Sequence, residues 1–220
     1  MAYLKHARTS KTTDARSRTK VKPHVSKGIE AAGLFSKVFT PFSMAAIVSV
    51  AFSWFSPNGI GPVMSPLSSA VTGILALCVA PFVPVAYSAR SGRTDLDVSD
   101  VKKRAPLYGV GLVGYALGTA AFYAFNNRLM FLMGLAYLCV GSAMFLITLL
   151  WKISAHTAGI AGPTTALVLV FGAWIVPLYA LSILMVWSRV KLRAHTLSQA
   201  IAGMIVAITI TILVFSADYL

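Results

Sequence analysis

The sequence predicts an all-α integral membrane protein, a bundle of helices that crosses a bilayer several times. Hydrophobic residues make up 57% of the 220-residue chain and charged residues only 11%. A soluble domain of this size could not bury so much apolar surface. The apolar residues also come in long runs, and a spanning helix needs about 20 of them. We therefore expect one membrane domain over residues 33–220, with about six to seven membrane segments.

Residues 1–32 are expected to form a basic, disordered tail on the cytoplasmic side. They are rich in Ser, Thr, Lys and Arg and contain no long apolar stretch, so no cleavable signal peptide is expected. A surface helix beginning near Ser26 is the alternative. The net charge of +13 suits a tail that contacts anionic lipid headgroups and sets the topology. We expect no nucleic-acid partner.

The first two spans are expected at residues 35–55 and 63–87, separated by a turn at 56–59. The second span contains three prolines, which remove backbone donors and predict kinks. These are Pro66, Pro81 and Pro84. A polar loop, residues 88–106, follows and holds the central aspartates.

Spans three and four are expected at residues 107–125 and 129–151. Only residues 126–128 separate them, so they should form an antiparallel hairpin. Four glycines give the third span a face of small residues that suits close helix packing. They are Gly109, Gly111, Gly114 and Gly118.

The positive-inside rule decides how the apolar segment 160–187 is folded. With a cytoplasmic N-terminus, a single crossing would place Arg189 and His195 on the outer side, against the charge rule. Two short helices that turn near Gly172 bring both residues back to the cytoplasmic side. We therefore expect a helical hairpin here, followed by a last span at 201–215.

Two histidines, His156 and His195, lie at the ends of apolar segments beside cationic residues. Ionisable groups at membrane depth are costly and usually functional. A group of Arg, Lys and His side chains with few acids suits an oxyanion such as phosphate. Guanidinium groups bind it bidentately, one imidazole can attack phosphorus, and the other can protonate the leaving group.

The residues around His195 resemble a known family signature. Ser188 and Arg189, then five residues and His195, reproduce the spacing S-R-x5-H. This is the third signature of the type 2 phosphatidic acid phosphatase (PAP2) superfamily, membrane enzymes that remove phosphate from lipid phosphates and isoprenyl diphosphates. The resemblance runs over residues 95–203 in three motifs.

The other two motifs come in the family's order. Ser154 and His156 lie in a segment similar to the second signature, P-S-G-H, with Ile153 in place of the proline and Ala155 in place of the glycine. Arg104 resembles the arginine that closes the first signature, K-x6-R-P, with Ala105 in place of the proline. The resemblance implies a PAP2-like helical bundle.

The resemblance also implies residue roles and a substrate class. His195 would be the nucleophile that forms a phosphohistidine, and His156 would be the general acid. No metal or other cofactor would be required, and the substrate would be a lipid or isoprenyl phosphate or diphosphate. The phosphoryl oxygens would be held by four cations and a serine: Arg104, Arg189, Lys103, Lys152 and Ser154.

Two further positions depart from the family pattern and bear on the chemistry. Asp97 stands where the family has a lysine, seven residues before Arg104, so a neighbouring lysine would have to replace it. Gln199 stands where the family has an aspartate, four residues after the nucleophile. An amide can hold the tautomer of His195 by a hydrogen bond but cannot stabilise imidazolium by charge. The site is therefore either tuned differently or weakly active.

The aspartates support a second hypothesis. Asp95, Asp97 and Asp100, followed by Arg104, are faintly similar to the acidic motif with which UbiA-type membrane prenyltransferases hold Mg²⁺ and a diphosphate. Such enzymes need a second acidic cluster, and the only later acid is Asp218. Asp97 and Asp100 could also bind Mg²⁺ in a phosphatase, or Asp100 could cap a helix. A non-catalytic membrane protein is the third class.

Overall fold

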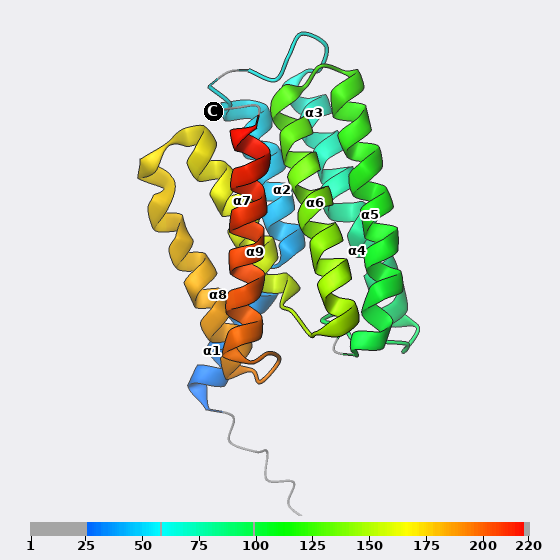
Figure 1. Ribbon diagram of the computed structural model, residues 1–220, viewed down its shortest axis with the longest axis vertical. Coiled ribbons are helices and arrows are strands. Elements are labelled where there is room, and N and C mark those ends of the chain that lie inside the picture. The colour runs from blue at the N-terminus through cyan, green and yellow to red at the C-terminus, as the bar shows by residue number, and fades with distance from the viewer. Residues whose placement is uncertain (1–25, 58, 99, 218–220) are drawn as a thin grey trace, which may run out of the picture.

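The computed structural model describes residues 26–57, 59–98 and 100–217, and these are entirely helical apart from their connections (Figure 1). In this part of the chain, five helices are long and apolar enough to cross a membrane, or six if a bent pair counts as one span. Only 22% to 39% of each of the five apolar windows is buried inside the protein. The rest of their apolar surface faces outward, as in a membrane helical bundle. Of the disordered tail predicted over residues 1–32, residues 1–25 lie outside the described residues, and the prediction is wrong for residues 27–32, which are helical.

The first membrane segment is a bent pair of helices. It consists of α1 (Lys27–Val38) and α2 (Pro41–Phe55), and the helix axis bends by 46° between them. Thr40 and Ser43 cap α2 reciprocally, and this capping box fixes where the second helix begins. α1 begins directly after Ser26. This agrees with the alternative prediction, in which a helix begins near Ser26. This short helix packs against α8 and forms one wall of the site described below.

The second segment is a continuous helix with a π turn at its centre. It runs through α3 (Pro66–Gly73), the π turn η1 (Ile74–Val79) and α4 (Ala80–Arg90). Pro66 occupies the first helical position, where its missing N–H costs nothing, so it makes no kink. The two later prolines, Pro81 and Pro84, lie in α4 directly after the π turn.

α5 (Val101–Ala124) and α6 (Arg128–Leu150) form the predicted hairpin. The Asp100 side chain accepts a hydrogen bond from Lys102 N at 3.0 Å and caps α5, which confirms the capping interpretation. The polar loop predicted over residues 88–106 is therefore too long. α4 continues to Arg90 and α5 starts at Val101, so Arg104 lies in the first turns of a helix.

The small-residue face predicted for α5 is used for close helix packing. Three of its four glycines pack against the second segment. A Cβ added to Gly114 would lie 2.7 Å from the Ala80 Cβ, so only glycine permits this approach. Gly111 and Gly118 likewise face Pro81 and Ala76. Gly109 has no such neighbour.

The segment after α6 folds as the predicted hairpin. α7 (Ala155–Phe171) ends at Gly172, whose φ of +96° is readily adopted only by glycine, and a 3₁₀ turn, η2 (Ala173–Leu178), leads into α8 (Tyr179–Lys191). α9 (Leu197–Ser216) then packs beside α7. Figure 1 shows α1 and the connections before α5, α7 and α9 at one end of the bundle. The motif residues lie at this end.

Candidate active site

The three motifs come together although they are far apart in the sequence. Arg104 lies in α5, His156 in the first turn of α7 and Arg189 in the last turn of α8. His195 follows in the connection to α9. A backbone hydrogen bond from Ser154 N to the carbonyl oxygen of Gln199, at 3.3 Å, ties the start of α7 to the start of α9.

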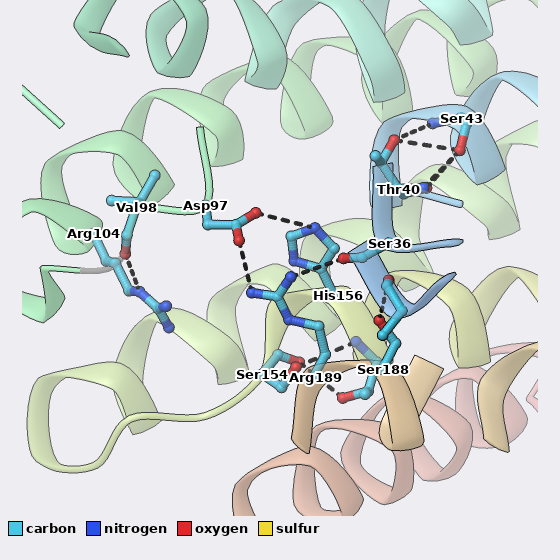
Figure 2. A network of polar contacts seen from close by, with 12 residues as sticks. Ser36, Thr40, Ser43, Asp97, Val98, Arg104, Ser154, His156, Ser188 and Arg189 are labelled. Atoms are coloured by element: carbon cyan, nitrogen blue, oxygen red, sulfur yellow. Dashed lines mark hydrogen bonds and ion pairs between the residues drawn. The ribbon is translucent and has the colours of Figure 1, made fainter. Parts of the chain in front are cut away.

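Arg189 is the most buried cation of the group, with 2% of its surface exposed. Its Nη2 donates to Asp97 Oδ2 at 3.0 Å, and its Nη1 donates to Ser36 Oγ at 2.8 Å (Figure 2). Its Nε is buried without a hydrogen-bond partner among the described residues. Buried donors are normally satisfied, so this nitrogen is an exception in the site.

Asp97 also faces the first histidine. Its Oδ1 lies 3.6 Å from His156 Nε2, and the imidazole is 14% exposed. Burial favours the protonated carboxyl, but His156 and Arg189 outweigh it and hold the pKa of Asp97 below its usual value. Figure 2 shows the carboxylate between the imidazole and the guanidinium. Asp97 is therefore an ionised partner of both groups.

Arg104 is 5% exposed and bound through backbone oxygens. Its Nε donates to the carbonyl oxygen of Val98 at 2.7 Å, and its Nη1 donates to that of Ile153 at 3.0 Å. Val98 has φ +47°, an uncommon conformation for a β-branched residue, in the segment that presents this carbonyl. Carbonyl groups orient the guanidinium without neutralising it, so its positive charge remains available to an anion.

His195 has a neutral partner. Gln199 Oε1 lies 3.3 Å from His195 Nδ1 and also accepts from Thr196 N at 3.2 Å. Because Oε1 is an acceptor, Nδ1 carries the proton and Nε2 keeps its lone pair. Burial and the charges of Arg104, Arg189 and Lys152 lower the pKa of His195 to about 3. The imidazole is neutral at physiological pH, as a nucleophile requires.

The remaining predicted residues have different positions. Lys152 is half-buried, and burial together with the charges of Arg104 and Arg189 lowers its pKa. Lys103 is 50% exposed and pairs with Asp100 at 3.7 Å, so it points away from the buried cations. Ser154 is fully buried and caps α7, with its Oγ accepting from Thr157 N.

A cavity of about 1180 Å³ runs from these cations into the bundle. Arg104, His156, Arg189 and Asp97 line its polar end, whereas His195 is not in its lining. Most of the remaining wall is apolar or aromatic. It includes Phe82, Tyr108, Tyr115, Met133, Tyr137 and Met144. Asp95 also lines the cavity, so its polar end carries charges of both signs. A charged headgroup with a long apolar chain fits this combination of a charged end and an apolar interior.

Two residues of the site were not identified as such from the sequence. Ser36 in α1 binds Arg189, but a serine near the end of a basic segment carries no distinguishing signal. Asp97 was assigned to repel phosphate or bind Mg²⁺, whereas it pairs with Arg189 and His156. Since Arg189 was predicted at membrane depth, its need for a carboxylate partner was the available signal.

Among the described residues, no group of three or more His, Cys, Asp or Glu side chains is arranged to hold a metal ion. Asp97 and Asp100, the candidate Mg²⁺ ligands, have separate roles: Asp97 pairs with Arg189 and faces His156, and Asp100 caps α5. No protein-family model, curated protein or solved structure matches the chain.

Proposed function

We propose that this protein is a membrane phosphatase of the PAP2 type that hydrolyses a lipid or isoprenyl phosphate or diphosphate through a phosphohistidine. The observation that carries the proposal is the cavity, because Arg104, Arg189 and His156 line one end of a space that is otherwise mostly apolar. Such a site binds an amphiphile with an anionic headgroup. The motif resemblance supplies the reaction type.

In the proposed first step, the phosphoryl group lies on the guanidinium groups of Arg104 and Arg189. Both cations line the cavity, and their charges lower the pKa of His195, which itself lies outside the cavity lining. The lone pair of His195 Nε2 attacks phosphorus, and the bond from phosphorus to the leaving oxygen breaks. The imidazolium form of His156 gives its proton to that oxygen, so that a neutral alcohol or a protonated phosphate departs. This form is the minor one in the free protein, because burial and the guanidinium groups lower the pKa of His156.

In the second step, water hydrolyses the phosphohistidine. His156, now neutral, takes a proton from the attacking water, and the bond between phosphorus and His195 breaks. Inorganic phosphate leaves, and both imidazoles return to their starting states. Gln199 keeps the proton of His195 on Nδ1 through both steps, so the reactive nitrogen stays the same. The mechanism uses no metal.

We place the site on the cytoplasmic side. Basic residues concentrate at the end of the bundle that holds the motifs, and cytoplasmic connections of membrane proteins carry the excess of Lys and Arg. The opposite end carries Arg128 at the start of α6. Cysteine labelling at position 198, in intact cells and in lysed cells, tests this orientation: labelling that needs lysis supports it, and labelling of intact cells contradicts it.

The test of the function is phosphate release by the purified protein in detergent. A panel of isoprenyl and glycerolipid phosphates is assayed with and without EDTA, for the wild type, His195→Ala and His156→Ala. Release that resists EDTA and is lost in both variants is expected. Release abolished by EDTA would contradict the proposal and favour a Mg²⁺-dependent mechanism at the aspartates. Lys103→Ala is the matched control and should keep full activity.

A further inference from the structure

Asp97, at the position where the family signature has a lysine, is in ion-pair contact with the histidine assigned as general acid. Its Oδ1 lies 3.6 Å from His156 Nε2, and its Oδ2 accepts from Arg189 Nη2 at 3.0 Å. The substitution therefore does more than remove a phosphate-binding cation. It introduces a negative charge next to one particular imidazole.

The other charges around His156 oppose its protonation. Burial of the imidazole opposes its protonation most, and the guanidinium groups of Arg189 from α8 and Arg104 from α5 add to this effect, so that the pKa of His156 is lowered to about 4. Asp97, from the segment before α5, is the carboxylate that offsets them. Without an opposing negative charge, a histidine in this position would not hold the proton that the leaving group needs.

We infer that Asp97 is a positioning residue that raises the affinity of His156 for a proton against the opposing charges, and so favours the imidazolium that protonates the leaving oxygen. This inference rests on the proposed function. The ion pair at 3.6 Å is longer than a charge-assisted hydrogen bond, which measures about 2.7–2.9 Å. The proton on Nε2 is thus stabilised by Asp97 without being bound tightly to it, and a substrate oxygen can receive it.

The hydrogen bond from Arg189 fixes the carboxylate of Asp97 in place. Arg189 is itself held by Ser36 from α1, so Asp97 has a rigid partner although 44% of its side chain is exposed. An aspartate that orients an imidazole and stabilises imidazolium is a general arrangement in acid–base catalysis. In this protein it serves the proton donor rather than the nucleophile.

The test exploits leaving groups of different basicity. An alkyl or isoprenyl phosphate needs its leaving oxygen protonated, whereas nitrophenyl phosphate has a good leaving group and hardly does. For Asp97→Asn we expect kcat on the alkyl phosphate to fall about 10²-fold, with hydrolysis of nitrophenyl phosphate nearly unchanged. KM should stay the same or fall, because Arg189 is freed. Asp97→Glu, which keeps the charge, should restore alkyl phosphate turnover.

A pH profile adds a readout that a merely structural role would not move. In Asp97→Asn the alkaline limb of kcat should shift to lower pH, because imidazolium loses its counter-charge while Arg189 and Arg104 remain. His156→Gln should show the same dependence on leaving group, and the double variant should lose no more than His156→Gln alone.

Equal losses on both substrates, or an unchanged kcat on the alkyl phosphate, would overturn the assignment of Asp97. Nitrophenyl phosphate turnover by Asp97→Asn also demonstrates that the variant is folded. If the wild type hydrolyses neither substrate, the proposed function fails. That outcome is distinct from a failure of Asp97 alone.

Discussion

The two histidines of the site lie at the same end of the bundle but have different partners. His156 faces the carboxylate of Asp97, and His195 faces the amide of Gln199. In the family signature that the chain resembles, the aspartate follows the nucleophile, at the position of Gln199. Here the acidic partner is found at the other histidine.

This difference separates two tasks that a carboxylate can perform. A neutral acceptor such as Gln199 fixes which nitrogen of His195 carries the proton, and that is sufficient for a nucleophile that reacts in its neutral form. A proton donor must carry a charge, so His156 benefits from a charged partner. In this comparison, the charged partner lies beside the proposed proton donor, and the neutral partner lies beside the proposed nucleophile.

The largest expected effect distinguishes the two histidines themselves. His195→Asn removes the proposed nucleophile, and we expect turnover to fall by roughly 10⁴-fold or more on every substrate. His156→Gln removes only the proton donor, with an expected loss of about 10²–10⁴-fold that is confined to poor leaving groups. Single-turnover assays with alkyl and nitrophenyl phosphates measure both. Equal behaviour of the two variants would contradict the separate roles.

The next effect concerns Arg189, which contacts Asp97 beside His156 and whose charge also acts on His195. Arg189→Lys keeps the charge, but a single ammonium cannot reproduce a planar guanidinium that bridges Asp97 and Ser36. We expect KM for a lipid phosphate to rise by about 10-fold or more. Lys103→Ala, at an exposed site, is the control that should leave KM unchanged. An unchanged KM in Arg189→Lys would place the phosphate elsewhere.

The comparison can be sharpened by giving His195 a charged partner. Gln199→Glu keeps an oxygen that accepts from Thr196 N and from His195, and adds a negative charge. The pKa of His195, now about 3, should rise, because the charged form gains a partner. The acid limb of kcat/KM should therefore move to higher pH than in the wild type. Coincident acid limbs would show that His195 does not control this limb.

The smallest expected effect is on how the free energy of unfolding depends on pH. Unfolded histidine has a pKa of about 6.5, and that of folded His195 is about 3, so the unfolded state binds more protons between these values. Stability should be complete above about pH 6.5 and fall as the pH is lowered, by about 2 kcal/mol at pH 5. His195→Asn should show a smaller loss between pH 7 and 5 in thermal unfolding. An identical loss in both proteins would contradict a buried neutral His195.

Much of the fold could be predicted from the sequence because the physics is local or follows from the bilayer. Run lengths of apolar residues located the spans, and the charge rule required the hairpin that turns at Gly172. The bounds near the site were less predictable. Asp100 starts α5 earlier than the apolar pattern does, because a cap acts through a hydrogen bond that hydropathy does not register.

The candidate site could be predicted only in part for a related reason. Spacing identified Arg104, His156, Arg189 and His195, which the fold brings to one end. Pairing between residues distant in sequence was not visible, so the contact of Asp97 with Arg189 and the role of Ser36 emerged only from the structure. Lys103 is the opposite case. The sequence suggested that it binds phosphate, but it lies in the first turn of α5 and is half exposed.

Trapping the phosphoenzyme tests the central claim most directly. The purified protein is mixed with a lipid phosphate labelled at phosphorus, quenched in alkali and digested. The labelled peptide is then identified in the wild type and in His195→Asn. We predict an acid-labile, alkali-stable phosphate on the peptide that contains His195, formed in the presence of EDTA and missing in the variant. Label on His156, or turnover in His195→Asn, would contradict the assignment of His195 as the nucleophile.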